Sequence, residues 1–102
     1  MKPTIDTSPL LQRIAQAIER HQPRQGLLRV SIARDAKWET SPSSSEQVLV
    51  RWLCWSLQDG DDELVPPEFE VLHPDVTEER LREALPDIFP SVKVVVDDDI
   101  DV

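Results

Sequence analysis

The sequence predicts a small α+β domain in which helices pack on a short sheet, in the order helix, strand, helix, strand, helix, strand. Its 102 residues are the length of one ordinary domain with a single core. Apolar residues recur every three or four positions near the N-terminus, and every second position from Leu28 onward. Nine prolines and only two glycines favour stiff connections over flexible linkers. We therefore expect a single domain over residues 1–102, with flexible ends at 1–7 and 97–102.

The first predicted element is a helix that begins near Ser8. A serine followed by Pro9 provides an N-cap and then a residue that is preorganised for the first helical position. Apolar side chains follow at helical spacing, and the pattern ends before Pro23 and Gly26. One face of this helix should therefore pack on the core.

The second predicted element is a strand that starts at Leu28. Val30 and Ile32 continue its apolar face at a period of two, while Arg29 lies on the other face. The polar residues that follow, 34–45, include a run of serines and are typical of a loop.

Residues 48–57 are the most apolar stretch of the chain, and they fit either a buried helix or a buried strand. A helix is favoured because Ser43 and Glu46 have the spacing of a capping box, and because Arg51 falls in a narrow polar stripe on a helical wheel. The valines and tryptophans of the stretch favour a strand instead. With a strand here, the order becomes helix, three-stranded meander, helix, strand.

The C-terminal part of the chain predicts a strand, a helix and a last strand. Gly60 ends the preceding element, and residues 69–72 form a short edge strand. Asp75 and Glu78 have the spacing of a capping box for a helix over residues 76–85, although Thr77 could cap it instead. A strand over 92–96 stops where the aspartates begin. The predicted core consists of Leu11, Ile14, Ile18, Val30, Ile32, Leu49, Trp52, Leu53, Leu81, Leu85, Val94 and Val96.

The charge of the chain is strongly acidic, with 20 acidic residues against 11 basic ones and a formal net charge of -9. Four of the acids fall in the last six positions, and the remaining 16 still outnumber the 11 bases. Nucleic-acid binding usually draws its affinity from basic patches, so this balance argues against a nucleic-acid partner. A basic protein is the partner that the charge favours.

The single cysteine, Cys54, excludes a disulfide framework or a cysteine-built zinc site within one chain, which fits a reducing cytoplasm. The first ten residues contain no apolar core of signal-peptide length, and Arg51 interrupts the longest apolar stretch. We therefore expect a cytoplasmic protein with no membrane partner.

The sequence contains no convincing catalytic or metal-binding motif. Asp59 to Glu70 follow the register of a calcium loop, but Leu64 stands where a glycine must turn the chain. His21 and His73 have no neighbour at metal-ligand spacing, and the chain has no nucleophile elbow and no glycine-rich phosphate loop. We expect no catalytic residues, no metal and no cofactor, and a protein that is not an enzyme.

These observations favour a non-enzymatic, acidic protein-interaction module that docks a basic partner. It would resemble in its action an inhibitor, an immunity or antitoxin protein, or a mimic of nucleic-acid charge, because complementary charge steers association. The alternative is a structural or assembly subunit that uses an apolar face of residues 48–57 or the edge strand over 92–96, with self-association as one form. A small enzyme is the third hypothesis. The predicted partner-binding residues are Trp38 as an aromatic anchor and, for steering, Asp59, Asp61, Asp62, Glu63, Asp97, Asp98 and Asp99.

Overall fold

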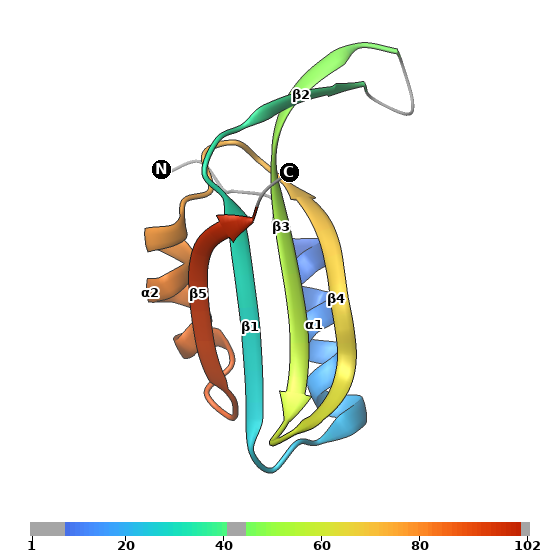
Figure 1. Ribbon diagram of the computed structural model, residues 1–102, viewed down its shortest axis with the longest axis vertical. Helices are drawn as coiled ribbons and strands as arrows, with labels where there is room; N and C mark the ends of the chain where they lie inside the picture. The colour runs from blue at the N-terminus through green and yellow to red at the C-terminus, as the bar shows by residue number, and fades with distance from the viewer. Residues whose placement is uncertain (1–7, 41–44, 101–102) are drawn as a thin grey trace.

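The computed structural model describes residues 8–40 and 45–100, which form two helices and one mixed sheet (Figure 1). The α+β class is confirmed. The elements, in chain order, are α1 (Ser8–His21), β1 (Gly26–Ala33), β2 (Lys37–Thr40), β3 (Gln47–Asp59), β4 (Asp62–Leu72), α2 (Glu78–Ile88) and β5 (Lys93–Ile100).

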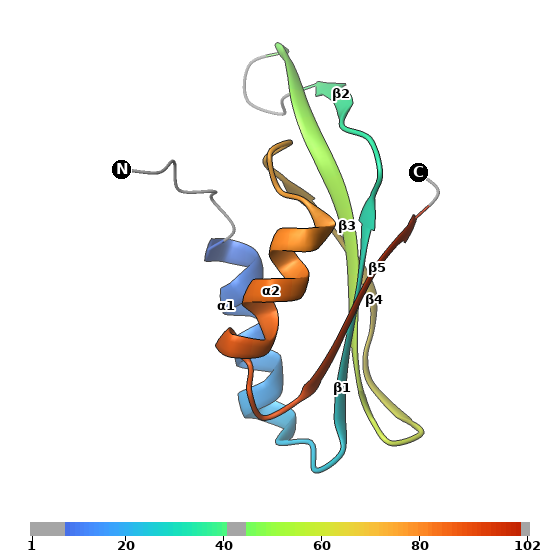
Figure 2. The same cartoon turned by 90° about the vertical axis from the view of Figure 1, so that its left-hand side faces the viewer.

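The sheet has the spatial order β4, β3, β1, β5, and β2 pairs with the first residues of β3. β3 runs antiparallel to both β1 and β4, whereas β5 runs parallel to β1. A parallel neighbour needs a crossover connection, and α2 provides it. Both helices lie on the same side of the sheet (Figure 2). The opposite side, which we call the open face, is covered by no helix among the described residues.

The helix predicted over residues 48–57 is wrong, because these residues belong to β3. The alternative order with a strand at this position is the observed one, with β2 as an additional strand. Leu53, Trp55 and Leu57 are buried under the helices, and the residues between them are half-buried on the open face. The alternation that marks a strand was hidden because apolar side chains occupy both faces.

β2 lies in the stretch that was predicted as a loop. Its four residues pair with the first four of β3, from Lys37 opposite Val50 to Thr40 opposite Gln47. This short ribbon continues beyond the end of β4, which pairs with β3 only from Arg51 onward (Figure 1). We call β2 together with residues 47–50 the arm. Ser43, the serine of the predicted capping box, lies outside the described residues.

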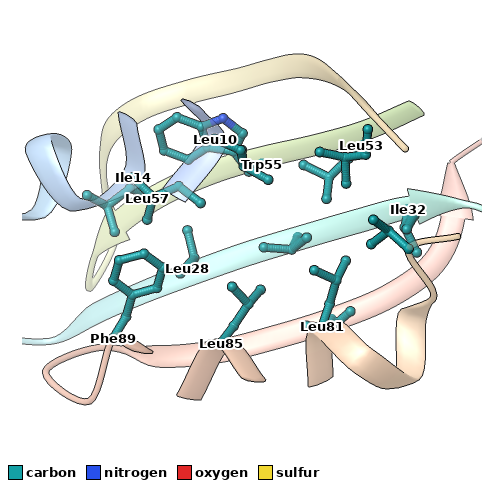
Figure 3. Packing of buried hydrophobic residues seen from close by; sticks show 14 of the residues in the cluster. Leu10, Ile14, Leu28, Ile32, Leu53, Trp55, Leu57, Leu81, Leu85 and Phe89 are labelled. Carbon is teal, nitrogen blue, oxygen red and sulfur yellow. The ribbon is translucent and has the colours of Figure 1, made fainter. Parts of the chain in front are cut away.

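The core lies between the helices and the sheet (Figure 3). Seven of the predicted core residues are buried, namely Ile14, Val30, Ile32, Leu53, Leu81, Leu85 and Val96. Leu11, Ile18 and Val94 pack against the cluster and are partly buried. Two predictions are wrong: Leu49 is exposed on the arm, and Trp52 is only half-buried on the open face.

Several element bounds differ from the prediction, and β1 begins at Gly26 instead of Leu28. The cap of α2 is Thr77 and not Asp75: its hydroxyl accepts a hydrogen bond from the N–H of Arg80, and the helix continues through Pro86 to Ile88. β4 is much longer than residues 69–72. β5 runs past the predicted end at Val96, because its pairing with β1 continues to Ala33 opposite Ile100. Residues 97–100 are thus part of a strand, while 1–7 and 101–102 lie outside the described residues.

Candidate interaction surface

The predicted acidic residues around the β3–β4 turn do not act as one group. The carboxylate of Asp59 accepts hydrogen bonds from the backbone N–H of Gln25 at 2.9 Å and of Arg24 at 3.3 Å. The N–H of Gly60 also donates to the carbonyl oxygen of Gln25, at 3.1 Å. Asp59 therefore fixes the loop between α1 and β1.

The other acids of this turn, Asp61, Asp62 and Glu63, are exposed. The turn is a two-residue hairpin closed by the pair Asp59 and Asp62. Gly60 has a φ of 58°, as the first central residue of a type II′ turn requires, so the hairpin is stiff. The three acids are held at one end of the sheet.

The acids of β5 lie at the opposite end. β5 starts beside Leu27 and ends beside Ala33, so Asp97 and Asp98 are a strand's length from the hairpin. Asp98 forms an ion pair with Arg34 at 3.4 Å, and its carbonyl oxygen also accepts from Nε of Arg34 at 3.3 Å. Asp99 lies in β5, and its side chain is not described. The structure therefore separates the two predicted acidic groups.

The predicted anchor, Trp38, lies on the arm and is 64% exposed. Its partner across the ribbon is Leu49, and side chains at paired positions point to the same face. This exposed pair is on the helix side of the sheet, like Leu53 and Trp55, but on the arm rather than in the core.

The open face carries a second apolar group that the sequence did not indicate as a site. Trp52 pairs with Val71 on β4, and Phe69 is the next outward residue along that strand. The rings of Trp52 and Phe69 meet edge to face, with centroids 6.3 Å apart and an interplanar angle of 77°. Phe69 is 58% exposed and Val71 is 48% exposed. We call Trp52, Phe69 and Val71 the open-face strip.

Charged residues border this strip. The indole Nε1 of Trp52 donates a hydrogen bond to Oε2 of Glu39, 3.1 Å away on β2. Asp97 lies in the same row of the sheet as Phe69, through Ser31 and Cys54. Lys37 reaches the same face at the base of the arm, opposite Val50. Glu39 is thus the acid that contacts the strip, while β1 and β3 lie between Asp97 and Phe69.

The alternation of residues 68–71 separates the two faces of β4 but does not say which of them the helices cover. Glu70 points to the helix side, where it forms an ion pair with Arg13 and accepts from Nε1 of Trp55 at 3.4 Å. Acids on the helix side of an edge strand leave the apolar residues between them on the other face. In the sequence, Phe69 and Val71 are indistinguishable from core residues.

Cys54 lies on the open face between Ser31 and Phe69. Burial raises the pKa of this thiol above its ordinary value of 9.0. A raised pKa keeps the thiol protonated at neutral pH, which is the opposite of what an activated nucleophile needs.

The histidines occupy two separate places. His21 lines an open groove of about 620 Å³ between α1 and β4, together with Arg13, Glu68 and Trp55. His73 faces Asp75, with Nδ1 and Oδ2 3.6 Å apart. Over residues 8–40 and 45–100, no cluster of three or more histidine, cysteine or acidic residues could hold a metal ion.

Comparisons with protein-family models, with curated proteins and with solved structures give no significant match. No helix in the described part of the chain is long and apolar enough to cross a membrane.

Proposed function

We propose that this chain is a non-enzymatic protein-interaction module that docks a basic partner protein on the open face. The observation that carries the proposal is the open-face strip: an edge-to-face aromatic pair and a valine exposed together on the side of the sheet without helices. Single exposed apolar residues are ordinary, whereas a contiguous group marks an interaction site.

The strip offers substantial contact energy. Fully burying a Phe or Val side chain contributes about 1.5–3 kcal/mol relative to leaving it in water, and Phe69 and Val71 have about half of their surface still to bury. Aromatic residues in such positions are the usual energetic centres of interfaces. The half-buried Trp52 holds Phe69 in place through its ring edge.

The charge selects the partner. At a net charge of -9, the chain attracts basic proteins and repels acidic ones before contact. Glu39 brings negative charge to the border of the strip, Asp97 lies farther along the same row of the open face, and the hairpin acids lie at the far end of the sheet. The partner surface that fits is an apolar patch surrounded by lysine and arginine.

A peptide array tests the proposal. Its members are matched in apolar content and differ only in the sign of their charge. Wild-type protein should retain basic members over acidic ones, and retention should fall as salt rises toward the 1 M range, where the Debye length is about 3 Å.

Phe69→Ser should reduce this retention at least tenfold. The matched control is Ile88→Ser, because Ile88 is 45% exposed but lies at the end of α2. Equal retention by both variants, or a preference for acidic peptides, would contradict the proposal.

A further inference from the structure

The arm leaves part of β3 with an unpaired backbone edge. Residues 47–50 have β2 on one side, while β4 ends at Leu72 opposite Arg51. Among the described residues, no strand continues the line of β4 along the arm. We call residues 47–50 on this side the free edge.

The other strand edges carry residues that discourage pairing. β4 contains Pro66 and Pro67, β5 contains Asp97 and Asp98, and β2 contains Lys37 and Glu39. Prolines and charges are the usual means by which proteins block edge-to-edge association. The free edge, with the sequence Gln-Val-Leu-Val, has neither.

The hairpin at the other end of β3 indicates which backbone groups point to the free edge. In a two-residue turn the carbonyl of the first residue, Asp59, accepts from the residue after the turn, so it points toward β4. Backbone groups alternate sides along a strand, and β3 keeps a constant register with β1. Every second residue back from Asp59 therefore points to the β4 side, and Leu49 is one of them. Its N–H and carbonyl face the free edge, whereas those of Val48 and Val50 face β2.

We propose that the free edge pairs with the free edge of a second copy of this chain, antiparallel and about a two-fold axis. A two-fold axis brings the same residues together, and an edge without charge can meet its own copy without like-charge repulsion. The arm also exposes apolar side chains on both of its faces: Trp38, 64% exposed, lies beside Leu49, and Val48 is 40% exposed on the other face. An isolated two-stranded ribbon is marginal in water, and pairing of two arms would make a four-stranded sheet in which these side chains gain neighbours on the same face.

The size of the edge sets the strength of the dimer. Four residues bury less than the roughly 800 Å² per partner of a standard interface, so the dimer is weak and reversible. Two copies that each carry a net charge of -9 repel at long range, and salt screens this repulsion. Self-association should therefore strengthen with salt, whereas docking of a basic partner should weaken. The inference does not rest on the proposed function, because it uses the arm and not the open-face strip.

Sedimentation equilibrium over a series of protein and salt concentrations tests the dimer. Leu49→Pro removes the N–H that points to the free edge and leaves the ladder to β2 in place. Leu49→Ala shortens the same side chain and keeps the N–H. We expect at least a tenfold loss of self-association for L49P, with a clearly smaller loss for L49A.

A second variant covers the case in which L49P fails to fold, as circular dichroism would show. Leu49→Lys keeps the N–H but brings like charges together at the two-fold axis, so it should also make the protein monomeric. A wild-type protein that stays monomeric at all concentrations would overturn the inference. Equal self-association of wild type and folded L49K would also overturn the inference. If only Phe69→Ser abolishes the dimer, the contact between copies lies on the open-face strip and not on the free edge.

Discussion

The guanidinium of Arg51 ties the base of the arm to the carbonyl of Ala33, which Nη1 reaches at 3.0 Å. The same nitrogen donates to the carbonyl of Arg34 at 2.6 Å, and Nε donates to the carbonyl of Pro74 at 3.2 Å. One half-buried side chain thus satisfies the backbone where β1 bends into β2 and where the chain leaves β4.

Arg51→Ala should therefore destabilise the protein by about 2 kcal/mol, because three carbonyls lose a charged donor and are partly shielded from water. Arg51→Lys should recover only part of this loss, because an ammonium group cannot span the same three acceptors. Urea unfolding measures both, with the exposed Arg29→Ala as control, expected within about 0.5 kcal/mol of wild type. A similar small effect for Arg51→Ala would show that water replaces the guanidinium.

The bond between Trp52 and Glu39 joins the arm to the open-face strip. Glu39→Ala should cost roughly 1 kcal/mol, since the pair is only partly buried and the freed indole N–H can reach water. Glu39→Gln keeps an acceptor and should lose less than half of that value. Denaturant unfolding of both variants, with the exposed Glu46→Ala for comparison, checks the prediction. Equal losses for Glu39→Ala and Glu39→Gln would mean that the charge, and not the hydrogen bond, is what matters.

The helix face of α1 and the alternation of β1 could be predicted because each follows from local spacing. The identity of β3 could not, because Trp52 and Cys54 fill the face that an amphipathic strand leaves polar. β2 has a single large apolar residue, Trp38, and forms because β3 extends past the residues that pair with β1 and offers it a partner.

Some residues of the candidate site could also be predicted from the sequence, and others could not. Trp38 could be singled out because polar residues surround it in the sequence. Phe69 and Val71 could not, because their exposure depends on both helices packing on the opposite face. The spatial separation of the acids follows from β5 being parallel to β1, which no local pattern encodes.

Cys54 should make stability depend on pH in the alkaline range. Burial raises the pKa of its thiol above 9.0, so the folded state holds the proton more tightly than the unfolded chain. The contribution of the protonated thiol to stability is complete below its ordinary pKa, and it is lost as pH rises through the raised pKa of the folded state. Relative to Cys54→Ser, wild-type protein should lose stability between about pH 8 and about pH 10, as urea midpoints would show. A constant difference between the two proteins across this range would contradict the assignment.

Pro66 and Pro67 should keep the β4 edge from pairing with other chains. Neither residue has a backbone N–H, and both lie in the middle of the strand that ends the sheet on this side. Replacing both by Thr restores two donors and adds β propensity without adding apolar surface. We expect the double variant to form species larger than a dimer, with growth that steepens with protein concentration in light scattering.

The double variant combined with Leu49→Pro separates the two edges. Species larger than a dimer need both edges, because one β4 edge can pair with only one other, so the combined variant should stop at a dimer that forms through β4. A combined variant that stays monomeric would show that the β4 edge does not pair. If the double variant is no larger than wild type, the prolines are not needed to keep this edge unpaired. Glu68 and Glu70 would then be sufficient, since charges on an edge strand also oppose pairing.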